Sequence, residues 1–156
     1  MTDEEKRLIR NVYTEKADKK INACIILTIL NITTYLYFII MGDFDFGIIC
    51  EGITLLLIFL AKSSIANDYE AGSIRYVVLS IIPIGWLIIF DFIAVITNAV
   101  DIMDFIYWLL AESILIADVV ILYLTYKDLR RAFNPEKYSE TKDNFYEKLD
   151  NNDNNK

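Results

Sequence analysis

Apolar residues fill four long runs of this chain, and charged residues collect at both ends and in one connection between the runs. A helix needs roughly 20 mostly apolar residues to cross a bilayer core of about 30 Å. The pattern therefore predicts four transmembrane helices, at residues 21–41, 46–65, 74–98 and 102–126. The second run is slightly short, and local thinning of the bilayer can accommodate it.

The charged N-terminal segment predicts an amphipathic helix ahead of the first span. Thr2 and Glu5 have the spacing of a capping box, in which each side chain accepts a hydrogen bond from the backbone amide of the other residue. Apolar residues then recur at helical spacing among Lys and Arg: Leu8, Ile9, Val12, Tyr13 and Ala17. Such a helix suits the membrane surface or docking on neighbouring cytoplasmic segments, and a solvated leader to the first span is the alternative.

The last helix is predicted to continue past the bilayer until Asn134 and Pro135 end it. From Glu136 onward the chain is too polar to fold alone, although a few apolar residues near the end have the spacing of one short amphipathic helix. We therefore divide the chain into a single membrane domain at 1–133 and a largely disordered tail at 134–156. The expected fold class is all-α: a four-helix transmembrane bundle with an N-terminal amphipathic helix and a cytoplasmic extension of the last helix.

The distribution of positive charge predicts the orientation of this bundle. All 15 Lys and Arg residues lie in the N-terminal segment, in the 62–75 connection or in the C-terminal segment. Positively charged connections stay on the cytoplasmic side of a membrane. We expect a multi-pass protein of the cell's inner (plasma) membrane with both termini in the cytoplasm.

Composition argues against several classes of protein. The net charge of -7 is unfavourable for binding nucleic acid, whose phosphates attract a basic surface. Histidine is absent, and Cys24 and Cys50 lie in separate apolar runs without a metal-binding spacing, so no metal or other cofactor is expected. Without histidine or a paired catalytic motif, we expect no enzyme activity.

Carboxyl groups inside the predicted spans are the candidate functional groups. Ionisable residues within a membrane are costly and usually face the protein interior or water. Counting 1.5 Å per residue from the outer turns places Glu51, Asp91 and Glu112 at similar depths of about 9 to 15 Å. No Lys, Arg or His occurs in any span, so these acids must be protonated, hydrated or paired with a bound cation.

Polar residues of the first span complete this predicted layer. Asn31, Thr34 and Tyr35 share one helix face and reach the same depth by the same count. Asp118 lies deeper and about 120° around its helix from Glu112, and we interpret it as a second contact or a relay toward the cytoplasm.

Pro83 and Gly85 lie inside the third span, where proline removes one backbone hydrogen bond. Membrane helices tolerate this as a kink when neighbouring groups satisfy the freed carbonyl. We expect a bend near Pro83, which is either a hinge or a static feature of the helix.

Two interpretations of the acid layer stay open. In one, neutral acids hydrogen-bond to their neighbours and hold the helices together. In the other, an outer pocket or pore collects protons or cations, and the protein conducts or couples them as a homo-oligomer. The alternative to transport is a membrane adaptor or immunity-like protein that binds a protein partner through its charged cytoplasmic segments.

Overall fold

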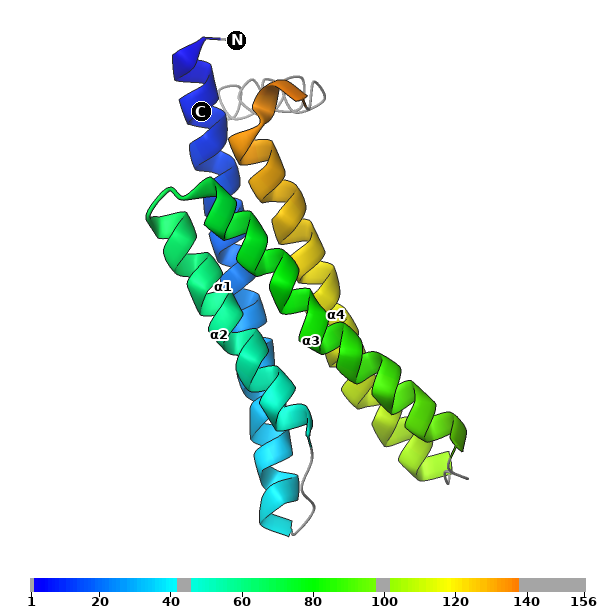
Figure 1. The fold of residues 1–156 in the computed structure, drawn as a ribbon. Coiled ribbons are helices and arrows are strands. Elements are labelled where there is room, and N and C mark those ends of the chain that lie inside the picture. Colours follow the sequence, from blue (N-terminus) through cyan, green and yellow to red (C-terminus); the bar gives the residue numbers. More distant parts are fainter. Residues whose placement is uncertain (1, 42–45, 98–101, 138–156) are drawn as a thin grey trace, which may run out of the picture.

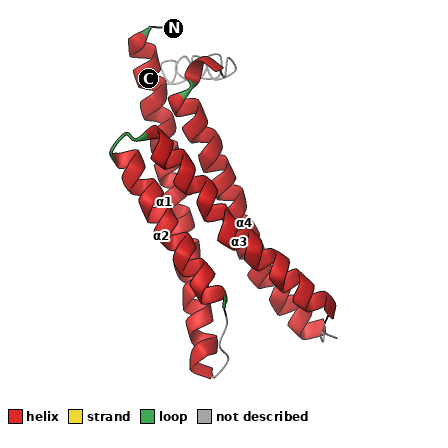
Figure 2. Ribbon diagram, viewed as in Figure 1, coloured by secondary structure: helices red, strands yellow, loops and turns green. Residues whose placement is uncertain are grey.

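The computed structural model describes residues 2–41, 46–97 and 102–137, and within these ranges it contains helices and no strand (Figure 2). Its elements are α1 (Asp3–Met41), α2 (Gly47–Ala66), α3 (Glu70–Thr97), α4 (Ile102–Phe133) and the short 3₁₀ turn η1 (Pro135–Lys137). The predicted all-α class and the four-helix bundle are confirmed.

The four helices alternate in direction, and each packs mainly against two neighbours, so that α1 contacts α2 and α4 while α3 contacts α2 and α4. The N-terminus, the α2–α3 turn and the end of α4 lie toward the same end of the bundle (Figure 1). Toward the opposite end, the α1–α2 pair and the α3–α4 pair diverge. The bundle therefore consists of two hairpins that are closest at the end carrying the basic residues.

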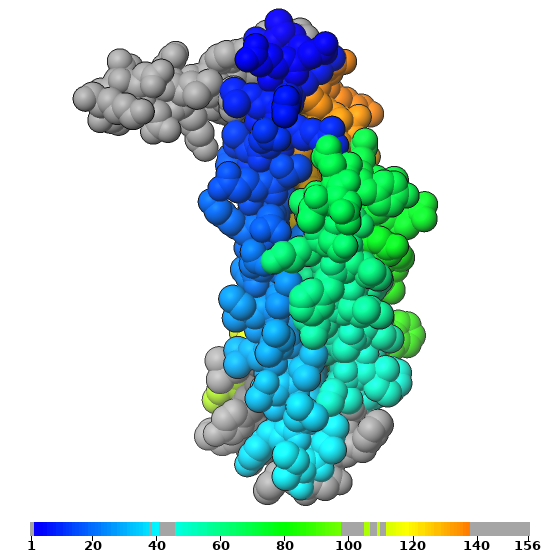
Figure 3. Space-filling view, turned by 90° about the vertical axis from the view of Figure 1, so that its left-hand side faces the viewer, coloured from blue at the N-terminus to red at the C-terminus, as the bar shows by residue number. Residues whose placement is uncertain are grey.

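Helix α1 differs from the prediction of a separate N-terminal amphipathic helix, because it runs without a break through 39 residues. The capping box at its start is confirmed: Thr2 N donates to Glu5 Oε2 at 2.7 Å, and Glu5 N donates to Thr2 Oγ1 at 3.2 Å. At 1.5 Å per residue, α1 is about 58 Å long, nearly twice the thickness of a bilayer core. Figure 3 shows its first turns projecting beyond the α2–α3 end of the bundle.

The projecting part of α1 docks on the end of α4. Ile9 and Tyr13 are buried there against Ala132, and Phe133 packs on the same cluster. The guanidinium group of Arg10 also lies 4.7 Å from the centre of the Phe133 ring. Of the alternatives for the N-terminal segment, the structure thus supports docking on a neighbouring segment.

Buried positions follow a spacing of three and four residues along every helix, the pattern of helices that pack lengthwise. On α1 they are Ile9, Tyr13, Ala17, Ile21, Cys24, Thr28 and Asn31. On α2 and α3 most are small: Gly47, Cys50, Thr54, Ala61, Ser64, Gly72, Ser73 and Ser80. Small residues at helix contacts let the helix backbones approach closely. In a membrane the surrounding lipid is as apolar as the side chains, so helices associate through this close packing and not through the hydrophobic effect.

The outward faces carry large apolar side chains instead. On α3, for example, Ile82, Trp86 and Phe90 are each 61% exposed. Three helices, α1, α2 and α3, are long and apolar enough to cross a membrane. The fourth predicted span includes side chains outside the described part of the chain, and it stays a prediction. This arrangement, with small and polar residues inside and bulky apolar residues outside, suits contact with lipid.

The α2–α3 turn is much shorter than the predicted 62–75 connection, because both helices extend into it. Tyr69 N donates to Ser64 O and Asp68 N donates to Ile65 O, at 2.8 and 3.0 Å, which is the pairing of a Schellman motif. Asp68 occupies the left-handed position of that motif with a φ of 58°. Arg10 of α1 holds the turn through an ion pair to Asp68 Oδ1 at 2.5 Å.

Helix α3 continues through Pro83, so proline does not end it. The bend predicted there stays a prediction. No heavy atom lies within 4 Å of the position that a Cβ on Gly85 would take, so this glycine does not mark a close helix contact. The predicted tail starts at residue 134, and its described part, residues 134–137, includes the turn η1. The rest of the predicted disorder and the predicted short amphipathic helix fall on residues 138–156, outside the described residues.

Candidate functional site

The first buried polar pair joins α1 and α2. Asn31 Nδ2 donates a hydrogen bond of 3.1 Å to Glu51 Oε1, and the Glu51 side chain is fully buried. The pair forms because α1 and α2 are antiparallel neighbours and both residues lie on the buried faces of their helices. The second oxygen of Glu51, Oε2, is buried, and no described residue forms a hydrogen bond with it.

Two buried threonines lie one turn from this pair, Thr28 on α1 and Thr54 on α2. Because the helices are antiparallel, a step of three residues from Asn31 and from Glu51 moves in the same direction along the bundle. Thr28 Oγ1 and Thr54 Oγ1 are both buried, and neither has a hydrogen-bond partner within the described part of the chain. They extend the polar face of the α1–α2 contact by one turn toward the bundle centre.

Asp118 of α4 joins this group from the other side. It is fully buried, and the Cys24 thiol of α1 lies close to its carboxyl group, although neither carboxyl oxygen has a partner in hydrogen-bonding geometry among the described residues. Its carboxyl group is close enough to Glu51 to act on it electrostatically. The Cys24 thiol of α1 lies 3.9 Å from the Asp118 carbonyl oxygen. The sequence interpretation set Asp118 apart from the acid layer, whereas the structure brings it into range of Glu51.

A second acid pair joins α3 and α4. The carboxyl group of Asp91 lies within hydrogen-bonding contact of Glu112, which is 4% exposed. Glu112 Oε2 nevertheless has no hydrogen-bond donor among the described residues. These two findings agree, because a carboxylate offers only acceptor oxygens unless it carries a proton. A hydrogen bond between the two carboxyl groups therefore requires a proton on one of them.

Four of the six residues in the predicted layer fall into two groups. Glu51 and Asn31 belong to the α1–α2 pair, and Asp91 and Glu112 belong to the α3–α4 pair. Tyr35 lies one turn from the first pair along the α1–α2 contact, where a Cβ on Gly47 would come within 2.6 Å of its ring.

Thr34 does not join either group. It is exposed, and its hydroxyl donates to the Leu30 carbonyl of its own helix at 3.2 Å. Thr28, Thr54 and Cys24 are the polar residues that sequence reasoning left out of the site. The helical spacing of Thr28 from Asn31 and of Thr54 from Glu51 was the signal that points to them.

The chemistry of this buried site is that of oxygen ligands. Among the described residues, no group of three or more Cys, Asp or Glu side chains is arranged to hold a metal ion. The sequence also places no Lys, Arg or His between residues 21 and 61 or between 76 and 126. Carboxyl, amide and hydroxyl groups without a basic partner can bind protons or hard cations.

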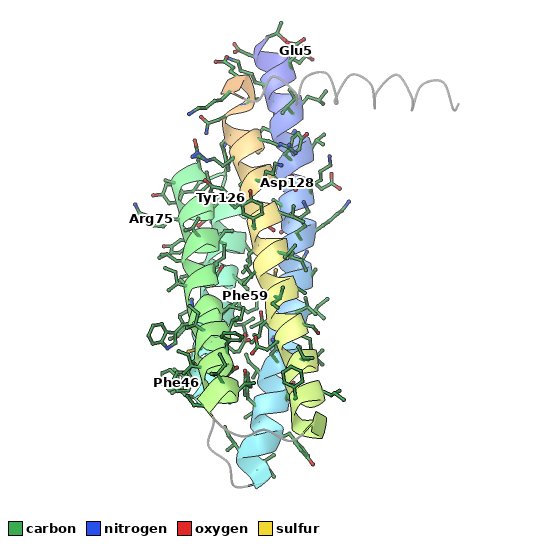
Figure 4. The ribbon with its side chains drawn as sticks, turned by 90° about the vertical axis from the view of Figure 1, so that its right-hand side faces the viewer. Glu5, Phe46, Phe59, Arg75, Tyr126 and Asp128 are labelled. Atoms are coloured by element: carbon green, nitrogen blue, oxygen red, sulfur yellow. The ribbon has the colours of Figure 1, made fainter. Side chains whose placement is uncertain are left out.

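Among the described residues, basic side chains form their ion pairs at the end of the bundle where α1 begins. Lys20 Nζ lies 2.5 Å from Asp128 Oδ2, where α4 faces α1 (Figure 4), and Lys62 Nζ donates to Asn22 Oδ1. These contacts tie α1 to α4 and to α2 at the edge of the apolar region.

Lys6 and Glu136 form a further ion pair of 2.6 Å between α1 and η1. Their hydrogen bond, reinforced by the opposite charges, raises the pKa of Lys6 above its usual 10.5 and lowers the pKa of Glu136 below its usual 4.5. Both side chains are exposed to solvent, so the pair acts as a surface contact that water and salt weaken.

Comparison of the chain with protein-family models, with curated proteins and with solved structures found no match. The structure shows a four-helix bundle of which three helices can cross a membrane, and its buried acids are the candidate site.

Proposed function

We propose that this protein is a small multi-pass membrane protein that binds and passes protons or small cations at its buried acids. The supporting observation is the environment of Glu51 and Asp118. Both side chains are fully buried, and three of their four carboxyl oxygens have no partner in hydrogen-bonding geometry among the described residues. No basic residue occurs in the surrounding apolar runs. A buried carboxylate is stable only when it is paired or has taken up a proton.

The proposed topology has four spans with both termini in the cytoplasm. It is supported by the three described helices that can cross a membrane and by the position of the start of α1 and the end of α4 at one end of the bundle (Figure 1). The basic residues lie at that same end, as the positive-inside rule requires of a cytoplasmic face. One bundle of four helices leaves little room for a hydrated path, so assembly of several copies is part of the proposal.

The test is flux through liposomes that contain the purified full-length protein. A pH-sensitive or Na⁺-sensitive dye inside the vesicles reports entry when an ion gradient is applied. Glu51→Gln removes the titratable group but keeps an oxygen that can accept the hydrogen bond from Asn31, so folding should be retained. We expect this variant to lose most of the flux.

Gly52→Ala is the matched control, because it changes the next residue of α2 where no heavy atom lies within 4 Å of the new Cβ. It should conduct like the unmodified protein. The proposal is wrong if the unmodified protein passes neither protons nor Na⁺, or if Glu51→Gln and Asp118→Asn both conduct normally.

A second candidate function is that of a membrane adaptor that binds a cytoplasmic protein. The observation favouring it is a pocket of about 310 Å³ where α1 meets the end of α4, lined by both basic and acidic side chains. Lys6 and Arg10 of this pocket already pair with Glu136 and Asp68, so Arg7, which is exposed, is the basic residue to test. Arg7→Glu should release a co-purifying partner without lowering the flux.

A further inference from the structure

Two buried threonines differ from the other helical threonines of this chain. Inside a helix, a threonine hydroxyl can donate to the carbonyl oxygen one turn earlier in the same helix. Five described threonines form this bond, at 2.8 to 3.2 Å: Thr14, Thr33, Thr34, Thr97 and Thr125. Thr28 of α1 and Thr54 of α2 are fully buried, and neither hydroxyl has a hydrogen-bond partner within the described residues. Both hydroxyl oxygens can therefore act as ligands between the helices.

The register of α1 against α2 places these two threonines opposite each other. Asn31 Nδ2 donates to Glu51 Oε1 at 3.1 Å, and further along the same contact Lys62 Nζ donates to Asn22 Oδ1. Between these two pairs the antiparallel helices hold the two threonines at one level of the bundle. Each threonine is three residues from its neighbour in the Asn31–Glu51 pair, a rise of about 4.5 Å.

Buried carboxyl groups approach these hydroxyls from two helices. Glu51 and Asp118 are both fully buried and lie within electrostatic range of each other. Asp118 of α4 reaches the level of the threonines, because its carbonyl oxygen lies 3.9 Å from the thiol of Cys24, one turn before Thr28 on α1. No basic residue occurs in the apolar runs that carry these groups. Hydroxyl and carboxyl oxygens are the ligands that hard cations take in proteins.

We propose that Thr28 Oγ1, Thr54 Oγ1 and Glu51 Oε2 bind a dehydrated Na⁺ ion between α1 and α2. Asp118 stabilises the charge of the ion from α4. A proton requires only a carboxyl oxygen and gives the two hydroxyls no role. A divalent ion takes six or more oxygen ligands, and among the described residues no three acidic or cysteine side chains are arranged to hold a metal ion. A monovalent ion also costs less to remove from water, so Na⁺ fits these ligands better.

This inference deepens the proposed function and rests on its claim that the buried acids take up a cation. The experiment measures binding at equilibrium, which does not require ions to cross the bundle. Radioactive Na⁺ is dialysed against the purified full-length protein in detergent, with unlabelled Na⁺ or choline as competitor. We expect saturable binding that unlabelled Na⁺ displaces and that choline, which is too large for the site, does not.

Valine variants test the two hydroxyl ligands, because valine keeps the shape of threonine and lacks the oxygen. Thr28→Val and Thr54→Val should each weaken Na⁺ binding about tenfold. Thr125→Val is the matched control, since this threonine is equally buried but its hydroxyl already donates to the Ile121 carbonyl at 2.8 Å. It should bind Na⁺ like the unmodified protein.

Thermal unfolding followed by circular dichroism provides a second measurement and establishes that each variant is folded. Added Na⁺ should raise the unfolding temperature of the unmodified protein and of Thr125→Val, because a ligand that binds only the folded state stabilises it. The double variant of Thr28 and Thr54 should show little or no such rise. Without Na⁺ it should be at least as stable as the unmodified protein, since it loses two buried hydroxyls that have no partner there.

The inference is overturned if the unmodified protein shows no saturable Na⁺ binding, or if choline displaces Na⁺ equally well. It is also overturned if the double variant keeps the unmodified affinity. Flux separates this result from the proposed function. If Na⁺ binds as expected and no ion crosses the bundle, the site stands and conduction is wrong. If proton flux depends on Glu51 but Na⁺ does not bind, conduction of protons stands and the Na⁺ site is wrong.

Discussion

The ion pair between Lys20 and Asp128 provides an asymmetric test of how the bundle is stabilised. Lys20 Nζ and Asp128 Oδ2 are 2.5 Å apart, but the side chains are 33% and 7% exposed respectively. If Lys20 is replaced by Met, the Asp128 carboxylate stays buried without its partner. Removing one member of a buried pair costs about 3 kcal/mol, which is roughly a 150-fold change in the unfolding equilibrium.

The reverse change should cost less. In Asp128→Asn the remaining Lys20 can turn its ammonium group toward water, because a third of the side chain is already exposed. The expected loss is about 1 kcal/mol, that of an ordinary hydrogen bond. The double variant, with no charge left to desolvate, should be more stable than Lys20→Met alone.

Unfolding of each variant in mixed micelles with increasing denaturing detergent gives the free energies, and circular dichroism follows the loss of helix. The four proteins form a double-mutant cycle that isolates the interaction energy of the pair. The reasoning is refuted if Asp128→Asn is as destabilising as Lys20→Met, or if the two effects simply add. Either result would mean that Asp128 is hydrated or partnered elsewhere.

Two further outcomes follow from the contacts of the bundle. Gly47→Ala should lower the free energy of unfolding by about 1 kcal/mol, because the new Cβ would lie 2.6 Å from the Tyr35 ring and displace it. Gly85→Ala has open space around the new Cβ, so it should leave the stability unchanged or raise it slightly. Unfolding in denaturing detergent measures both effects. Docking of η1 on α1 should weaken at low pH, when Glu136 takes up a proton below its lowered pKa, which lies under 4.5. It should weaken again at high pH, when Lys6 loses its proton above its raised pKa, which lies beyond 10.5. The distance between spin labels on α1 and η1 reports this, and Lys6→Met should abolish the pH dependence.

The sequence by itself determined the four helices. Long apolar runs can satisfy their backbone hydrogen bonds in a membrane only as helices, and each of the four predicted runs lies, to within one residue, in one of the four helices of the structure. The capping box at Thr2 could also be predicted from the sequence, because its two hydrogen bonds depend only on residues three positions apart. Local chemistry was sufficient for each of these features.

Tertiary structure alone decided which polar groups meet. Helical spacing shows that Asn31 and Thr34 lie near each other on α1, but the packing of α2 buries Asn31 on Glu51 and leaves Thr34 exposed. The packing of α4 likewise brings Asp118 into contact with Cys24 of α1, and Glu112 into contact with Asp91 of α3. A rotation of 100° per residue defines the faces of one helix, whereas the neighbour that each face meets depends on the close fit of small residues across the bundle.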